Sequence, residues 1–410
     1  MSDVNVLAIV FSPANVISAL GATLGRYGER AAVTLGVCDW PGMSAENNRD
    51  RLESLRRMVS AVGIVRNVIA VTDVMAAHAA AEPTASDLAA EVRKWFDEPF
   101  DEIMLCHDLH GGVYQLACMA WPNAHRVSFG DGFGHVCSKE DLLSAQAVLG
   151  SRGELIRMIA RARIARYGNW LRWRLASGLG LGAIPKPDEI LFAPGEYRLF
   201  MPMSDFGTPV PARKLTILPR SLFLDVIGLV RRSIGAEVYE AELLARAGGK
   251  SAVLLGTENY VESGLLTMDQ EIAMWLDILE PHLAGHPVVV VKGHPGEHEE
   301  LARWPILAEH LAGRAEVIPF ATAHKRMPLE AFSGLLGSFA LVTSAFARVS
   351  LKYMSGIDIP NPLTDERIRA YFPKWFHPHI TKIAQDQDAY IAALRRWSGR
   401  GMLYRGERPR

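Results

Sequence analysis

A lysine and a histidine follow a run of four valines in the second half of the chain. The segment 287–295 reads PVVVVKGHP, so Lys292, Gly293 and His294 come directly after the valines. Proline cannot continue a central strand, so Pro295 ends the strand and leaves His294 where its side chain can face a cleft. An imidazole near its usual pKa can donate a hydrogen bond to a phosphate oxygen or protonate it. The pattern predicts a phosphate-contacting histidine; the alternative is a histidine that only ends the strand.

The same segment also fits a zinc pattern. Residues 294–298 read HPGEH, which matches the H-x-x-E-H spacing of one metalloprotease class. That spacing needs a helix to bring both histidines to one face, and Pro295 and Gly296 oppose a helix. The four cysteines form no CxxC pair either. The sequence therefore predicts no metal site.

An aspartate stands between two glycines after another apolar run, in HRVSFGDGFG. Gly130 and Gly132 let the backbone turn tightly and let a ligand approach it closely. A carboxylate on a loop at a strand end is well placed to be a general base, so we expect Asp131 to be catalytic. The alternative is a turn in which Asp131 bonds to its own backbone.

Hydroxyl and carboxyl groups follow in the last third of the chain. Thr343 and Ser344 come after the apolar run FALV and before a helical pattern. Small hydroxyls there can bind an anion together with helix N-terminal N–H groups, or serve as a plain N-cap. Glu330, early in the helical segment PLEAFSGLL, can accept hydrogen bonds from ribose hydroxyls or a base amine.

The order KGHP, PLEAFSGLL, VTSAF resembles the donor-binding half of bacterial sialyltransferases, which belong to the GT-B class with two Rossmann-like domains. Those families carry a D/E-D/E-G motif in the N-terminal half, then an HP motif and a Ser-Ser/Thr motif. The matching positions are Asp131, His294-Pro295 and Thr343-Ser344. Polysialyltransferase-like and lipooligosaccharide sialyltransferase families look most similar, although their first acidic position is glycine here.

This resemblance implies an inverting, metal-independent transfer of a sialic acid or related nonulosonic acid from its CMP-activated form to a saccharide acceptor. Asp131 would take the proton of the acceptor hydroxyl. His294, with Thr343 and Ser344, would stabilise the departing phosphate. No cofactor is implied, because the CMP-sugar is itself a substrate.

Further residues receive roles from the same resemblance. Lys292 would add a positive field, and Glu330 would hold the cytidine. Gly256 and Thr257, after SAVLL, would let the nucleotide approach the backbone. The remaining candidates are Gly293 and Pro295 on the donor side and Ser12, Asn15, Gly130 and Gly132 on the acceptor side.

The elements that must position these residues alternate between apolar strands and helical patterns. The run 4–11 (VNVLAIVF) reads as a strand buried on both faces, and SPANVISAL then opens a helix. Further strands are expected in 31–40, 101–109 and 125–132. In the second half they are expected in 251–259, 287–295, 315–320 and 339–346.

The alternation predicts an α/β protein with two domains in tandem and a cleft between them. The resemblance implies the GT-B type, in which two Rossmann-like domains face each other across that cleft. We expect an acceptor-side domain over 1–235 and a donor domain over 236–382. A helix and basic tail over 383–410 would pack back towards the first domain.

Composition sets the wider context. A formal net charge of −1 gives no general reason to expect nucleic acid as a partner. No cationic start precedes the first apolar run, which predicts a cytoplasmic protein. The basic stretch 152–176, with its two tryptophans, is either a solvated helix or an interfacial helix that contacts the inner membrane peripherally.

Other functions stay open at this point. A transferase using CMP-activated Kdo shares these motifs, and a sugar-nucleotide epimerase or hydrolase can use the same fold. A non-catalytic binding protein is a third class. The acceptor, whether lipopolysaccharide, capsule or glycoprotein, is not readable from the sequence, nor is the linkage or the oligomeric state.

Overall fold

The computed structural model of this chain describes residues 4–39, 44–71, 92–94, 96, 99–106, 117–118, 120–130, 195–200, 215–343, 348, 351–352, 356 and 359–377, with four single positions between 164 and 175. The candidates Asp131, Gly132 and Ser344 lie outside the described residues, as do nearly all of the basic stretch 152–176 and the segment 383–410.

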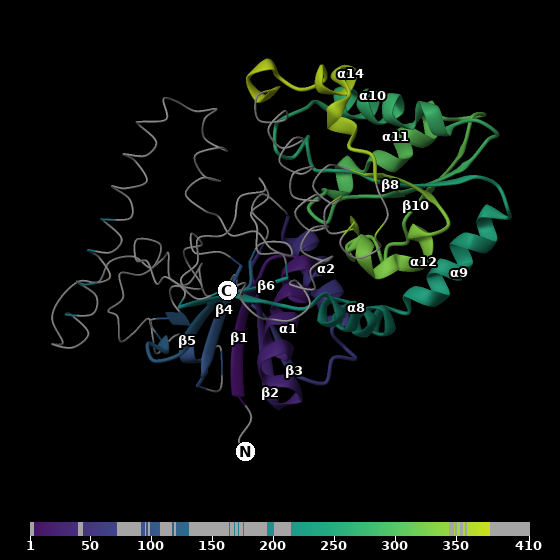
Figure 1. The fold of residues 1–410 in the computed structure, drawn as a ribbon. Helices are drawn as coiled ribbons and strands as arrows, with labels where there is room; N and C mark the ends of the chain where they lie inside the picture. The colour runs from purple at the N-terminus through teal and green to yellow at the C-terminus, as the bar shows by residue number, and fades with distance from the viewer. Residues whose placement is uncertain are drawn as a thin grey trace, which may run out of the picture. The chain divides into compact units, whose positions relative to one another are not determined.

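The chain divides into two compact units (Figure 1). Of the described residues, unit 1 holds those within Met1–Asp39 and Gly63–Phe223, and unit 2 those within Trp40–Val62 and Leu224–Arg396. The division falls inside helix α8 (Arg220–Ile234), whereas we expected a boundary at residue 235.

The contacts of α8 explain this difference. Near the start of the helix, Phe223 packs edge-on against Phe200 of unit 1, with 5.3 Å between ring centroids. Near its end, Arg231 donates to the carbonyl of Ala331 in unit 2 over 2.7 Å. One helix therefore contributes to both cores.

Unit 1 is built on a seven-stranded sheet in the order β3-β2-β1-β4-β5-β6-β7, with every pair parallel. The strands are β1 (Val4–Val10), β2 (Ala31–Val37), β3 (Val65–Ala70), β4 (Glu102–Leu105), β5 (His125–Ser128), β6 (Glu196–Leu199) and β7 (Leu215–Ile217). Helix α1 (Pro13–Tyr27) and the short η1 (Gly28–Arg30) connect β1 to β2. This strand order is that of a doubly wound Rossmann-like sheet.

Unit 2 is also built on a parallel sheet, with the strand order β10-β9-β8-β11. The strands are β8 (Ala252–Gly256), β9 (Val288–Lys292), β10 (Glu316–Pro319) and β11 (Ala340–Thr343). Figure 1 shows α10 and α11 on one side of this sheet and α9 and α12 on the other.

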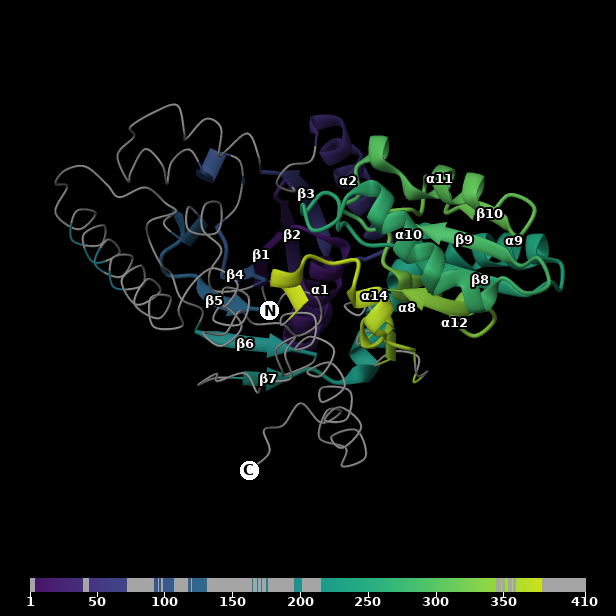
Figure 2. The same ribbon diagram turned by 90° about the horizontal axis from the view of Figure 1, so that it is seen from above.

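The helical elements of unit 2 are α2 (Ala45–Met58), α9 (Ala236–Ala247), α10 (Met268–Leu279), α11 (Arg303–His310), α12 (Ser333–Leu336) and α14 (Glu366–Arg369). The 3-10 turns are η3 (Glu280–His282), η4 (Glu299–Leu301), η5 (Leu329–Phe332), η6 (Pro362–Thr364) and η7 (Lys374–Phe376). Figure 2 shows the same arrangement from above.

The predicted α/β class with two Rossmann-like units is confirmed. Every strand expected from an apolar run is present, because runs such as VVVV are stable only where both sheet faces are covered. The strand β3 was not expected, since half-exposed residues along VRNVIA weaken its apolar signal. Helices α8 and α9 were not expected either.

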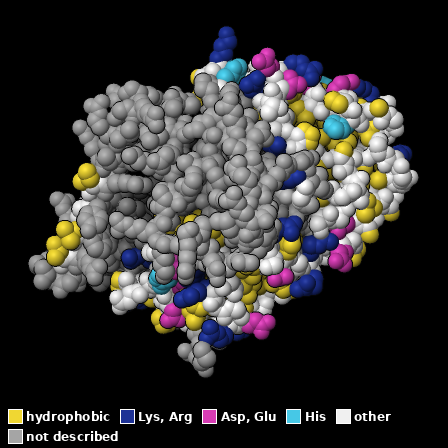
Figure 3. All heavy atoms as spheres, viewed as in Figure 1, with side chains coloured by type: hydrophobic (Ala, Val, Ile, Leu, Met, Phe, Trp, Pro, Cys, Tyr) yellow, Lys and Arg dark blue, Asp and Glu magenta, His cyan; other side chains and the backbone are white. Residues whose placement is uncertain are grey.

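Among the described residues, no helix combines the length and apolarity needed to cross a membrane. On the face drawn in Figure 3, basic and acidic side chains of the described residues lie interspersed. This mixture agrees with a net charge close to zero.

Candidate functional site

Charged side chains gather at the carboxyl ends of the strands of unit 2. Parallel strands end at one edge of their sheet, and the pairing of Gly256 with Lys292 brings the ends of β8 and β9 together. We call this group the carboxyl-edge cluster: Thr257, Glu258, Lys292, His294, Glu297, Arg326 and Glu330. All of these belong to unit 2.

His294 is held in one tautomer by its own loop. Its Nδ1 accepts a hydrogen bond from the backbone N–H of Gly296 over 3.0 Å. Burial lowers the pKa of His294 to about 4, and the charge of Lys292 acts in the same direction. The ring is therefore neutral near pH 7 and carries its proton on Nε2.

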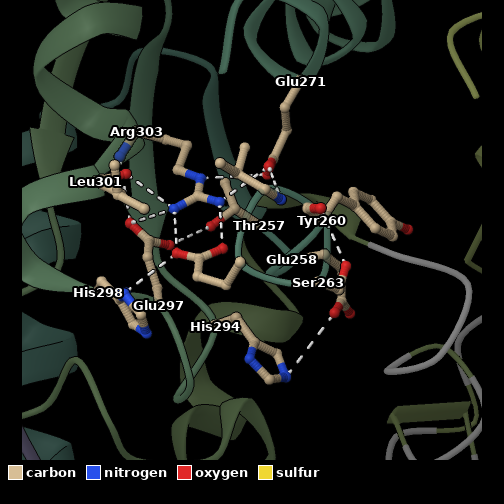
Figure 4. Close-up of polar contacts among 12 residues, drawn as sticks. Thr257, Glu258, Tyr260, Ser263, Glu271, His294, Glu297, His298, Leu301 and Arg303 are labelled. Atoms are coloured by element: carbon tan, nitrogen blue, oxygen red, sulfur yellow. Dashed lines mark hydrogen bonds and ion pairs between the residues drawn. The ribbon is translucent and has the colours of Figure 1, made fainter. Parts of the chain in front are cut away.

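The Nε2 atom of His294 faces a carboxylate. It lies 3.8 Å from Oε2 of Glu258, beyond direct hydrogen-bond distance (Figure 4). The imidazole thus presents an N–H donor and the neighbouring carboxylate presents an acceptor. A ligand with a phosphate oxygen and a hydroxyl group matches this pair.

Lys292 places a cation beneath the same loop. Only 3% of the residue is exposed, and its ammonium donates to the carbonyls of Lys325 and Gly293 over 3.0 and 3.4 Å. Burial lowers the pKa of Lys292 to about 8, while the carboxylates of Glu330 and Glu297 oppose that shift. The ammonium form persists at neutral pH and gives the cluster a positive field.

Arg303 ties three segments of unit 2 together. Its guanidinium is fully buried and makes two 2.7 Å hydrogen bonds to Glu262 and bonds of 2.9 and 3.3 Å to Glu271 (Figure 4). Its backbone N–H donates to Glu297 over 3.2 Å. Burial acts to raise the pKa of Glu262, yet the hydrogen bonds from Arg303 hold it below the usual value.

The loop after β9 is fixed from two further sides. Glu297 accepts a 3.0 Å hydrogen bond from the hydroxyl of Thr257, which follows β8. Arg326 donates to the carbonyl of Pro295 over 2.8 Å and to Asn47 over 3.1 Å. Pro295 and Gly296 form a turn, as expected, so the HPGEH segment is not a helix. His294 therefore sits on a loop with a defined shape.

A cavity of about 240 Å³ opens beside this loop. The loop following β9, the start of α11 and the loop following β10 form its walls. His294 and Glu297 contribute to the lining, and so do Trp304, Phe320 and Arg326. Three members of the cluster, His294, Glu297 and Arg326, thus border a concavity large enough for part of a nucleotide.

Two glycines of the predicted site have packing reasons for their identity. A Cβ on Gly256 would lie 2.8 Å from Oγ1 of Thr343 and 3.1 Å from Leu329. A Cβ on Gly293 would lie 2.5 Å from the carboxylate of Glu297. Gly256 is therefore required where β8 and β11 meet, and the side chain of Thr343 is packed against β8.

Most donor-side candidates come together in unit 2. Lys292, Gly293, His294 and Pro295 share one loop, with Thr257 and Glu330 in the same cluster, and Thr343 ends the neighbouring strand β11. Glu330 is 6% exposed and lies in η5. Ser344 belongs to the undescribed part of the chain, so its anion-binding role stays a prediction.

The acceptor-side candidates lie in unit 1. The hydroxyl of Ser12 accepts from the backbone N–H of Asn15 over 3.2 Å, and Oδ1 of Asn15 accepts from Phe11 over 3.1 Å. Ser12 thus caps helix α1, and Asn15 holds the residue that precedes the cap. Gly130 follows β5 with φ of 82°, a conformation that favours glycine.

Asp131 and Gly132, the centre of that predicted motif, fall outside the described residues. The expected cleft between the domains, and the encounter of Asp131 with His294 across it, remain predictions.

Sequence reasoning did not identify Glu258, Glu297, Arg303 and Arg326 as parts of this site. Glu297 had a signal, since it is the glutamate of HPGEH. Arg326 and Arg303 had none, because most of their side-chain partners lie 31 to 279 residues away along the chain.

No protein-family model and no curated protein sequence matches the chain. Among solved structures, a protein described as a UDP-N-acetylglucosamine 2-epimerase from Listeria monocytogenes aligns over 100% of this chain and 99% of its own, at 12% identity and a TM-score of 0.43. The UDP-GlcNAc 2-epimerase from Neisseria meningitidis aligns over 98% of this chain and 93% of its own, at 10% identity and a TM-score of 0.42.

A glycosyltransferase from Streptomyces nogalater aligns over 97% of this chain and 99% of its own, at 11% identity and a TM-score of 0.35. TM-scores below 0.5 do not identify an activity.

Proposed function

We propose that this protein is a glycosyltransferase that moves a sialic acid or related nonulosonic acid from a CMP-activated donor to a saccharide acceptor. The observation that carries the proposal is the donor and acceptor pattern of the carboxyl-edge cluster. The Nε2–H of His294 and the buried ammonium of Lys292 suit a phosphate, and the carboxylate of Glu258 suits a hydroxyl.

The position of the cluster supports a nucleotide ligand. In open parallel sheets, ligands bind outside the carboxyl ends of the strands, and the HP loop lies at that edge beside β8. The Lys-Gly-His-Pro segment is also the one that carries the resemblance to bacterial sialyltransferases. The choice of CMP rather than another nucleotide rests on that resemblance.

In the proposed reaction, the acceptor hydroxyl oxygen forms a bond to the anomeric carbon while the bond from that carbon to the phosphate oxygen breaks. The electron pair leaves with CMP, and the His294 N–H and the Lys292 charge stabilise the developing phosphate charge. The hydroxyl proton passes to a general base, for which Asp131 is the candidate from the sequence.

A nucleotide titration tests the proposal. We expect CMP to bind and to raise the melting temperature, and UMP and GMP to do neither at the same concentration. The variant His294→Ala should lose most of this binding, whereas His310→Ala, on the exposed end of α11, should keep it.

Product analysis tests the reaction itself. Incubation with CMP-sialic acid and a glycan acceptor should release CMP and form the glycoside. Binding of a uridine nucleotide alone would contradict the CMP assignment, and sugar conversion without any acceptor would indicate an epimerase or hydrolase instead.

A further inference from the structure

The cavity beside His294 carries an exposed aromatic ring that the proposed reaction does not use. Trp304 is 38% exposed and lines the cavity, and Phe320 forms another part of the lining. A tryptophan with this much exposed surface on the wall of a concave site can stack on a flat ring.

The backbone at Trp304 is anchored through the preceding residue. Trp304 follows Arg303, whose guanidinium is fully buried and held by Glu262 and Glu271. The backbone N–H of Arg303 is anchored on Glu297 as well. The first turn of α11 is therefore rigid, and binding against the indole does not require ordering of the backbone.

The rest of the lining narrows the ligand class. The cavity wall holds two basic side chains, Lys325 and Arg326, and one carboxylate, that of Glu297. Basic groups outnumber acidic ones there, which favours a ring with carbonyl or ring-nitrogen acceptors over a cationic ring. At about 240 Å³ the cavity is smaller than typical sites for whole drug-sized ligands. It suits a single heteroaromatic base better than a complete sugar nucleotide.

The cavity also adjoins the expected phosphate position, because His294 lines it. We propose that Trp304 stacks on the pyrimidine base of the donor nucleotide while the phosphate contacts His294. This inference rests on the proposed function and adds a binding residue to it. Glu330 does not line the cavity, so the stack does not involve it.

Calorimetric titration of the full chain with CMP tests the stack. We expect Trp304→Ala to weaken CMP binding by about 10-fold or more, and Trp304→Phe to retain most of the affinity because a smaller aromatic face remains. Binding of inorganic phosphate should be the same in Trp304→Ala and in the wild type. Trp375→Ala is the matched control, since Trp375 is 54% exposed in unit 2 and does not line the cavity.

The outcomes separate this inference from the proposed function. If Trp304→Ala binds CMP like the wild type while His294→Ala does not, the stack is wrong and the phosphate site stands. If Trp304→Ala weakens a CMP-sugar but not CMP, the indole contacts the sugar and the inference is overturned. If the wild type binds no nucleotide, both proposals fail.

Discussion

The carboxylate of Glu297 occupies the space that a side chain on Gly293 would need. An ideal Cβ on Gly293 would lie 2.5 Å from Oε2 and 2.9 Å from Cδ of Glu297. Glu297 cannot yield easily, because it also binds the hydroxyl of Thr257 and the backbone N–H of Arg303. The glycine of the HP loop is therefore required by a neighbouring carboxylate.

We expect Gly293→Ala to destabilise the protein by about 1–3 kcal/mol, as overpacking does, and to displace the loop that carries His294. Urea unfolding measures the first effect, and CMP titration the second. Gly337→Ala is the control, since a Cβ there has nothing within 4 Å and its φ is −89°. Equal stability of the two variants would show that Glu297 moves aside without cost.

His294 is expected to act through its Nε2–H and without a positive charge. We expect His294→Ala to lower kcat by about 10²–10³, the usual effect of removing one electrostatic donor. His294→Gln should recover part of the loss because its amide keeps an N–H. Since the pKa of His294 is lowered to about 4, the pH profile of the rate between pH 5.5 and 7.5 should have the same shape in the wild type and in His294→Gln. A titration step present only in the wild type would show that the charged imidazole acts.

Lys292 should make nucleotide affinity depend on pH. Its pKa is lowered to about 8, so the ammonium that attracts the phosphate loses its proton as the pH rises above that value. We expect CMP affinity to be constant from pH 6.5 to 7.5 and to fall by up to tenfold per pH unit above about 8. Lys292→Met should bind weakly at every pH and lack this fall, which calorimetry in matched buffers can measure.

Lys292 should also make the stability of the protein depend on pH, but stability should rise with pH where the affinity for CMP falls. Because the folded pKa lies below the unfolded value, the unfolded chain binds more protons between about pH 8 and 10.5. The free energy of unfolding of the wild type should therefore rise with pH in this window relative to Lys292→Met. A relative decrease would contradict a buried, destabilised ammonium.

Arg303 is expected to be structural and to position its neighbours. Replacing it by alanine leaves Glu271, fully buried, and Glu262 without their main cation, so we expect a loss of about 3–5 kcal/mol. Arg303→Lys should recover only part of this lost stability, because lysine cannot make the same paired hydrogen bonds. Arg246→Ala breaks the exposed pair with Glu316 and should cost no more than about 1 kcal/mol. Chemical unfolding of the three variants ranks these effects.

The sequence alone determined the strands that carry the site. Apolar runs without alternation occur where both faces of a sheet are covered, and a glycine or proline at or just after the end of β8, β9 and β10 marks the edge where ligands bind. For this reason Lys292 and His294 could be placed at a strand end, and the turn at Pro295 could be expected from local chemistry.

Only the tertiary structure decided what these side chains contact. The link from Arg326 to Asn47 spans 279 residues, and the links from Arg303 to Glu262 and Glu271 span 41 and 32. No local pattern encodes such partners, because they are set by the strand order and by the packing of helices over the sheet. The packing reasons for Gly256 and Gly293, and the exposure of Trp304 beside the fully buried Arg303, follow from the same long-range contacts.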